Sequence, residues 1–340
     1  MGNINREQIM QYMLKQIHAH DRDIVAKTVE YFGISKSTVY NYLKKMCDDG
    51  IVQKTGDALQ PYQLISKKYE YQYQNDGSLS EDRVFDKDIA QHFSGYEKNV
   101  LSAWRYAFTE MMNNAIEHSE AKEILVIVSK NAFDCSIILY DDGIGIFKNI
   151  QRYMKNEKNE ELTLDECVAL LFAGKFTTAK HLHSGEGIFF TSHLMDKFLI
   201  LSDEICFTRD NFHDVQLSGF SVPTGTAVYM ALSNQSKKTA REVFDRFSNV
   251  EEGFIRTQIP IAHVFPNGNP VSRSEARRLG ELILRFKEID LDFANVEEVG
   301  QAFVHEMFVV WQHRNPEIQL NVCNANQAVE SMIKRVKNTQ

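Results

Sequence analysis

Long hydrophobic runs are missing from this chain of 340 residues. No stretch approaches the roughly 18 consecutive apolar residues that a membrane-spanning helix requires. The first residues also lack the apolar core of a secretory signal peptide. We therefore expect a cytoplasmic protein that does not enter a membrane. The 43% hydrophobic and 25% charged residues are ordinary for a globular chain, and the length allows two or three domains.

Cysteine is scarce, with five residues in the whole chain. An odd number of widely separated cysteines argues against a disulfide framework and against a zinc module. We expect reduced thiols that mostly pack as small core residues. The five are Cys47, Cys135, Cys167, Cys206 and Cys323.

Strong positive charge is also absent, because the formal net charge is -8. The chain as a whole therefore lacks the basic character that is typical of nucleic-acid-binding proteins. Only residues 1–75 are slightly basic, with ten Lys and Arg against eight Asp and Glu.

Residues 108–118 have apolar and polar positions at helical spacing, and nothing in them breaks a helix. Glu110 and Asn114 are four residues apart, so both side chains lie on one face. An amide oxygen can bind Mg²⁺ together with phosphate oxygens, and a carboxylate can polarise an attacking water. The pair therefore suits a nucleotide site that uses magnesium. The alternative is that both side chains are solvated surface.

Residues 122–130 and 135–140 are rich in Val and Ile and predict two neighbouring strands. The second strand runs into Asp141-Asp142-Gly143-Ile144-Gly145. Two glycines after an acidic residue allow a tight turn that brings the backbone close to a ligand. The alternative for Asp141 is a residue that only caps this turn.

A second glycine turn, Ser184-Gly185-Glu186-Gly187, enters an apolar helical stretch. Such a turn presents free backbone amides to a phosphate, although it can also be an ordinary loop. Further on, Pro223-Thr224-Gly225-Thr226 leads into a predicted strand at residues 227–232.

These four segments, in this order, resemble the Bergerat-fold (GHKL) ATPases, the superfamily that includes gyrases and histidine kinases. Residues 110–118 are most similar to the bacterial anti-sigma-factor serine kinases, in which Glu is followed by Asn-Ala four residues on and then by His. The resemblance covers about residues 85–235. It implies an α/β sandwich that binds ATP and Mg²⁺.

The resemblance also implies roles for individual residues. Glu110 would be the general base, Asn114 the magnesium ligand, and Asp141 the acceptor for the adenine amino group. The other implied contacts surround the nucleotide: Gly143 and Gly145 at the adenine, Gly185 and Gly187 at the phosphates, and Thr226 beneath the base.

Residues 147–184 lie between the two glycine turns, at the position of the ATP lid in the resembling family. We expect a helix at 162–171 and contacts to the terminal phosphates from Lys175 and from Thr177 or Thr178. A solvated loop is the alternative. The segment is not a Walker A loop, because the spacing of its glycine and lysine differs from that motif.

The N-terminal residues predict helices at 5–19, 21–32 and 36–48, followed by two short strands around a turn. This order resembles the winged helix-turn-helix domains of bacterial transcription regulators. In such domains the start of the third helix contacts DNA. The corresponding residues are Lys36, Ser37, Thr38, Tyr40 and Asn41, and Lys44 further along the helix would add a phosphate contact. The alternative is a winged helix that serves protein contacts or dimerisation.

The C-terminal residues alternate between predicted strands and helices, which indicates a small open α/β layer. The strands are expected at 258–265, 289–293 and 318–323, and the helices at 272–284, 299–313 and 326–336. The pattern resembles the STAS-like domains related to anti-sigma-factor antagonists. Antagonists carry a phosphorylatable Ser just before a Gly, whereas here Val299 precedes Gly300. We therefore do not expect the chain to phosphorylate its own third domain there.

The expected fold class is a multidomain α+β protein with a winged helix, a Bergerat sandwich and a small STAS-like α/β domain. The expected bounds are a winged helix at 1–68, a linker with an entry helix at 69–98, the ATP-binding domain at 99–235, a connector at 236–255 and the STAS-like domain at 256–340.

Three functions remain open from the sequence. The first is an ATP-binding regulator that couples nucleotide to DNA binding and partner docking. The second is an anti-sigma-type protein serine/threonine kinase that acts on a partner protein. The third is a non-enzymatic scaffold with a structural ATP site, against which the intact Glu110 argues. Families of the first two kinds act as dimers, so by analogy we expect a homodimer.

Overall fold

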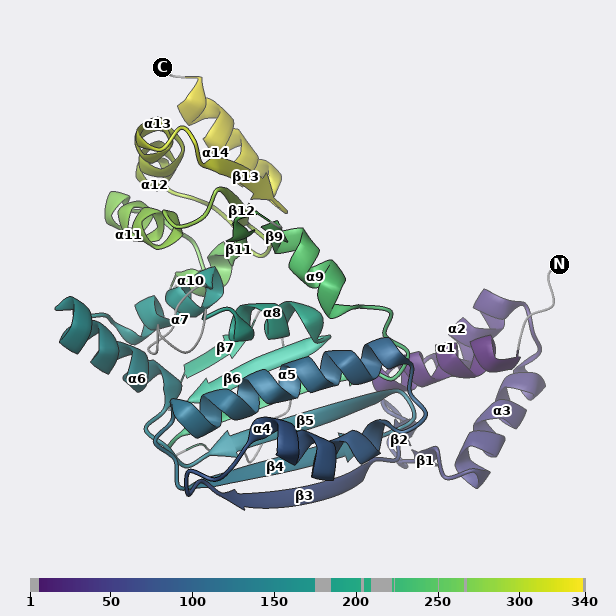
Figure 1. Cartoon of the computed structure of the whole chain (residues 1–340). Helices are drawn as coiled ribbons and strands as arrows, with labels where there is room; N and C mark the ends of the chain where they lie inside the picture. The colour runs from purple at the N-terminus through teal and green to yellow at the C-terminus, as the bar shows by residue number, and fades with distance from the viewer. Residues whose placement is uncertain are drawn as a thin grey trace.

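The computed structural model shows three units that follow one another along the chain (Figure 1). It describes residues 6–174, 185–202, 205–208, 222, 224–249, 251–265 and 268–338. Among these residues, no helix has both the length and the apolar character needed to cross a membrane.

The N-terminal unit has three helices and a hairpin. These elements are α1 (Arg6–His18), α2 (Ile24–Phe32), α3 (Lys36–Asp48), β1 (Val52–Lys54) and β2 (Tyr62–Leu64). The two strands are antiparallel. Helix α3 begins where the sequence predicts, because the Ser35 hydroxyl accepts a hydrogen bond from the Thr38 amide at 3.1 Å. The three helices and the hairpin agree with the expected elements, while the identification as a winged helix stays a prediction.

The central unit is built on a six-stranded antiparallel sheet with the strand order β3-β4-β5-β8-β6-β7. The strands are β3 (Lys67–Gln74), β4 (Glu123–Lys130), β5 (Asp134–Asp141), β6 (Lys197–Ser202), β7 (Ile205–Thr208) and β8 (Thr226–Ser233). Alternate residues of β4 from Ile124 to Val128 are fully buried, as the period of a half-covered sheet requires.

Helices cover one face of this sheet, with α5 running across it (Figure 1). The covering helices are α4 (Glu81–Val84) with its continuation to Phe93, α5 (Lys98–Glu117) and α8 (Gly187–Leu194). Helix α9 (Ala240–Phe247) packs on α5 and α8 through Phe244. The apolar side of α5 contributes Trp104, which stacks on Phe93 with ring centroids 5.3 Å apart. The helix is therefore fixed to the core along the side opposite its polar residues.

Residues 69–98 differ from the expected linker. Strand β3 pairs with β4 along its whole length, from Lys67 opposite Lys130 to Gln74 opposite Glu123. The segment that follows is also part of the core, since Phe85 is fully buried. The alternating tyrosines that predicted an extended piece belong to an edge strand, where Tyr71 and Tyr73 pack against the core. Their pairing partner lies far away in the sequence, so local pattern could not reveal it.

Between the glycine turns, the residues that the structure describes, up to Gly174, contain two helices. They are α6 (Ile146–Tyr153), which continues as a π-helix over Met154–Lys158, and α7 (Leu164–Ala173). The helix expected at 162–171 is α7. It begins at a capping box in which the Thr163 hydroxyl and the Glu166 carboxylate exchange hydrogen bonds with each other's backbone amide.

The C-terminal unit contains a three-stranded parallel sheet in the order β11-β12-β13. The short hairpin of β9 (Ser248–Asn249) and β10 (Gly253–Phe254) leads into β11 (Arg256–Pro260), and the other strands are β12 (Glu288–Asp292) and β13 (Gln319–Cys323). The helices are α10 (Ile261–Val264), α11 (Arg273–Ile283), α12 (Gln301–His305) with its continuation to Trp311, α13 (Gln312–Arg314) and α14 (Gln327–Lys337).

The strand expected at 258–265 was wrong in its second half. It ends at Pro260, and residues 261–264 form α10. Proline cannot donate to a strand ladder, which favours a strand end at this position.

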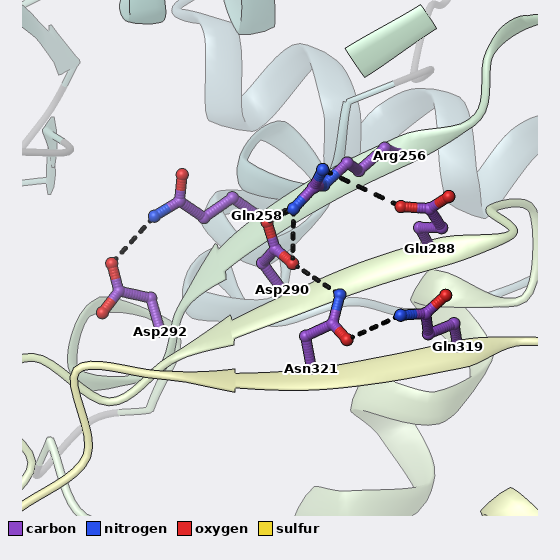
Figure 2. A network of polar contacts seen from close by, with 7 residues as sticks. All are labelled: Arg256, Gln258, Glu288, Asp290, Asp292, Gln319 and Asn321. Carbon is purple, nitrogen blue, oxygen red and sulfur yellow. Dashed lines mark hydrogen bonds and ion pairs between the residues drawn. The ribbon is translucent and has the colours of Figure 1, made fainter. Parts of the chain in front are cut away.

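One face of the parallel sheet carries a network of polar side chains (Figure 2). Asp290 is almost fully buried and accepts hydrogen bonds from Arg256 Nη2 at 2.8 Å and Asn321 Nδ2 at 2.9 Å. Because side chains alternate along a strand, Thr257 of β11 lies on the opposite, apolar face with Ile259. That face is directed toward the protein core.

Candidate functional site

A cavity lies between α5, the central sheet and the start of α8. It brings together six residues singled out from the sequence: Glu110, Asn114, Asp141, Gly185, Gly187 and Thr226. These residues come from four separate segments, so their convergence depends on the tertiary fold. The roles assigned to them by resemblance stay predictions.

Helix α5 supplies one wall of the cavity. Glu110, Asn114 and His118 recur every four residues and all line it. The fully buried Trp104 and Phe108 belong to the adjoining apolar side of the helix. The polar cavity residues therefore lie at the border of the apolar face that fixes α5 to the core, and Met111 and Ala115 of that face also line the cavity. Asn113 also lines the cavity, and the sequence reasoning missed it.

Asp141 ends β5 with its side chain in the cavity wall, and the residue is only 3% exposed. Its carboxylate Oδ1 accepts the Gly143 amide at 3.0 Å, so the turn-capping hydrogen bond exists. The same residue also lines the cavity, and its expected contact with the adenine amino group stays a prediction. Burial raises the pKa of Asp141 from 3.8 to about 7, and hydrogen bonds from the backbone of Gly143 and Thr226 partly oppose this rise.

Gly143 and Gly145 shape the turn after β5 and are not among the residues that line the cavity. A Cβ placed on Gly143 would overlap the Ser119 carbonyl oxygen, and Gly145 has φ 85° at the start of α6. Close packing at Gly143 and the positive φ at Gly145 each favour glycine. The expected contact of both glycines with the adenine stays a prediction.

Gly187 lies directly against the carboxylate of α5. A Cβ at this position would overlap Glu110 Oε2. This glycine therefore leaves room for the expected base, in addition to any contact of its amide with phosphate. Sequence reasoning gave only one reason for this glycine, namely that its turn presents free backbone amides to a phosphate.

Gly225 is a second close contact, because a Cβ there would overlap the Asp141 carbonyl oxygen. The next residue, Thr226, is opposite Asp141 in the strand register. Its hydroxyl accepts the Ile146 amide at 3.0 Å and so ties the start of β8 to the start of α6. The Thr-Gly-Thr sequence before a predicted strand was the available signal for Gly225.

Glu186 is a third carboxylate in the cavity wall, besides Glu110 and Asp141. Burial raises the pKa of Tyr106, and the charges of Glu110 and Glu186 raise it further, so both carboxylates act on the same region. The sequence reasoning missed Glu186, although its position between two glycines of the expected phosphate turn was a signal.

Three predicted nucleotide contacts cannot be placed. Lys175, Thr177 and Thr178 lie outside the described residues.

The predicted DNA contacts lie on α3. Lys36, Ser37, Tyr40, Asn41 and Lys44 are exposed, and Thr38 is half-buried. Val39, Leu43 and Met46 on the other side are buried in the core of the N-terminal unit. The expected contact residues therefore share the accessible side of one helix.

The oxygen atoms in the cavity suit Mg²⁺ better than a transition metal. Within the described part of the chain, no group of three or more His, Cys, Asp or Glu could hold a metal by itself. Amide and carboxylate oxygens from Asn114 and Glu110 are available in the cavity, and Mg²⁺ typically completes such a set with phosphate oxygens and water. The residues thus fit a metal that arrives with a nucleotide.

Two family models match this chain. Residues 75–205 match the histidine kinase-like ATPase domain. This chain contains a histidine kinase-like ATPase domain. Residues 275–330 match a STAS-like domain of unknown function. No curated protein is a match for the chain. The ATPase match includes the cavity residues of α5, β5 and α8, and it supports an ATP-binding protein of the GHKL type.

Proposed function

We propose that this chain is a cytoplasmic regulator that couples Mg-ATP binding and hydrolysis to DNA binding and partner docking. The N-terminal unit would be a winged helix that binds DNA, and the STAS-like domain would dock a partner protein or a second copy. The observation that carries the proposal is the cavity of the ATPase domain in which Glu110, Asn114 and Asp141 meet.

Each of these cavity residues has a distinct task in this proposal. Asp141 accepts the adenine amino group, and Asn114 holds the metal through its amide oxygen. Glu110 accepts a proton from the attacking water. The metal ion neutralises charge on the phosphates when the nucleotide is bound.

Strand β5 supports a connection between the cavity and the N-terminal unit. Asp141 at one end of β5 lines the cavity. Asp134 at the other end lies 3.6 Å from His18 Nε2 on α1. A single rigid strand thus links the adenine side of the cavity to the N-terminal unit. We expect nucleotide binding to shift the population of DNA-competent states through this strand.

A protein serine/threonine kinase is the second candidate, favoured by the similarity of residues 110–118 to anti-sigma-factor kinases. The γ-phosphate would then pass to a hydroxyl of a partner protein. The chain's own STAS-like domain has Val299 before Gly300 at the start of α12, so that position offers no acceptor hydroxyl.

DNA binding with and without Mg-ATP, measured by fluorescence anisotropy over a salt series, tests the coupling. We expect Mg-ATP to change the affinity. Lys36→Ala with Lys44→Ala should reduce the salt slope by about 0.9 for each DNA phosphate that the protein no longer neutralises. Lys334→Ala in α14 is the control. An affinity that is independent of both nucleotide and these lysines would contradict the proposal.

The fate of the terminal phosphate separates the two candidates. With γ-labelled ATP, release of inorganic phosphate by the protein alone supports the regulator. Label that appears on a hydroxyl of an added protein supports the kinase. Tight binding with neither outcome would leave only a structural ATP site, and the scaffold function would then be correct.

A further inference from the structure

The C-terminal unit contacts the end of α7, next to the cavity. The last turn of an α-helix leaves carbonyl groups without intrahelical partners. At α7 the carbonyl of Ala173 accepts a hydrogen bond from the Thr257 hydroxyl at 2.8 Å. Thr257 is 0% exposed and Ala173 is 1% exposed, so water does not compete for this bond. The end of α7 is therefore capped by β11 of another unit.

The residue after α7 is also fixed by the C-terminal unit. Gly174 has φ 78°, and a Cβ there would lie 2.8 Å from Phe254 Cε1. Phe254 belongs to β10 and comes just before β11. The same ring lies 4.5 Å from the Phe189 ring and 5.1 Å from the Phe190 ring on α8. One hairpin thus contacts both α7 and α8.

Both helices form walls of the cavity. Leu171, two residues before Ala173, lines it from α7, and Gly187 and Ile188 line it from α8. Any displacement of β10 and β11 would therefore move two walls of the proposed nucleotide site. Protein cores are close-packed, so such shifts are transmitted and not absorbed.

A surface ion pair contributes less to this junction. Arg278 Nη1 lies 3.2 Å from Glu166 Oε1 at the first turn of α7, but the arginine side chain is 55% exposed. Exposed pairs of this kind contribute little. Loss of the Thr257 hydroxyl would instead leave the Ala173 carbonyl buried without this partner, which is the costlier change.

We propose that Thr257 is a positioning residue of the nucleotide site. Through the hydrogen bond of Thr257, the STAS-like domain fixes the position of the end of α7. The proposal rests on the proposed function, because it requires the cavity to bind Mg-ATP. By linkage, nucleotide binding must then also stabilise β11, so the STAS-like unit senses the nucleotide state.

Affinity for Mg-ATP, measured by isothermal titration calorimetry on the full chain, tests this role. We expect Thr257→Val to weaken binding about three- to tenfold, since one buried hydrogen bond is removed. Thr257→Ser keeps the hydroxyl and should bind like the wild type. Thr28→Val is the matched control, because Thr28 is also 0% exposed and donates to a helix carbonyl, that of Ile24, in the N-terminal unit. It should change thermal stability but not affinity.

Hydrogen exchange of the β11 amides gives a second readout, which compares the wild type with the same two variants of Thr257. Mg-ATP should slow their exchange in the wild type and in Thr257→Ser, and this effect should be absent in Thr257→Val. Unchanged affinity of a folded Thr257→Val variant, or β11 exchange in the wild type that does not respond to Mg-ATP, would overturn the positioning role. A wild type that binds no Mg-ATP would instead overturn the proposed function, and this proposal with it.

Discussion

The two outer units join the ATPase domain in different ways. The C-terminal unit and the ATPase domain share one continuous buried cluster, in which Phe254 packs on α8 and Thr257 caps α7. The N-terminal unit has a separate core of its own. Its described junction includes Phe133 and Asp134 at the turn between β4 and β5, where the His18 and Phe133 rings are 4.6 Å apart.

This difference indicates different tasks for the two units. A unit that shares a core with the cavity walls cannot move without changing the nucleotide site. A unit with its own core can change its position at modest cost, since each part keeps its buried surface. We therefore infer that the C-terminal unit sets the affinity of the site for Mg-ATP. The N-terminal unit responds to whether the nucleotide is bound.

The largest expected effect is at the C-terminal junction. Phe254→Ala removes a buried ring between α8, Gly174 and Phe286, and should lower the free energy of unfolding by about 3–5 kcal/mol. Mg-ATP affinity should fall with it. Urea denaturation followed by near-ultraviolet circular dichroism measures the stability. A loss below about 1 kcal/mol would show that the two units are not one cooperative core.

Gly187 is the first residue of α8, the helix that also packs on Phe254. Substitution of Gly187 tests whether this glycine makes room for the Glu110 carboxylate. Gly187→Ala should displace the Glu110 carboxylate and lower ATP turnover about 100-fold, the contribution expected of a general base. In a Glu110→Gln background, the same substitution should change turnover by less than about twofold, because its target is already gone. Steady-state phosphate release measures both. Additive losses would mean that Gly187 acts on the phosphates alone.

The pH dependence of stability should have opposite sign at two places. The pKa of Asp141 is raised by burial to about 7, so its stabilising contribution is present below pH 3.8 and is lost as pH rises through about 7. Burial lowers the pKa of His18 below 6.5, so its contribution is present above pH 6.5 and is lost as pH falls.

Denaturation curves between pH 4 and 8 separate the two effects. Asp141→Asn should remove the loss of stability toward pH 7, at roughly 1.4 kcal/mol for each pKa unit. His18→Gln should remove the smaller loss on the acid side. Parallel curves for the wild type and both variants would show that neither group titrates as its surroundings indicate.

The smallest expected effect is at the N-terminal junction. Phe133→Ala removes the stacking of its ring on His18 and should cost about 1 kcal/mol. Mg-ATP affinity should stay within about twofold of the wild type, whereas the effect of Mg-ATP on DNA binding should disappear. Anisotropy titrations measure both. A large fall in ATP affinity would show that this junction affects the nucleotide site as the junction of the C-terminal unit does.

Local spacing was enough to find much of the candidate site. Glu110 and Asn114 are one helical turn apart, and Asp141 ends a strand just before a glycine turn, so both features are visible in short windows of sequence. These windows also located α3, α7 and α11 to within a few residues.

The missing parts depend on contacts between distant residues. The Thr257 hydroxyl reaches a carbonyl 84 positions earlier, and β3 pairs with β4, which lies beyond two intervening helical segments. Gly187 is required by a side chain of another helix, and Gly225 by the backbone of another strand. No local period encodes such contacts, so only the tertiary structure shows why these residues are needed.

Mg-ATP binding and turnover by the wild type, Glu110→Gln and Asn114→Ala are the most direct test of the central claim. The account predicts that the wild type binds and hydrolyses ATP. Glu110→Gln should still bind it but turn it over at least about 100-fold more slowly, and Asn114→Ala should lose the magnesium-dependent part of binding. Absence of nucleotide binding by the wild type at millimolar ATP would contradict the account.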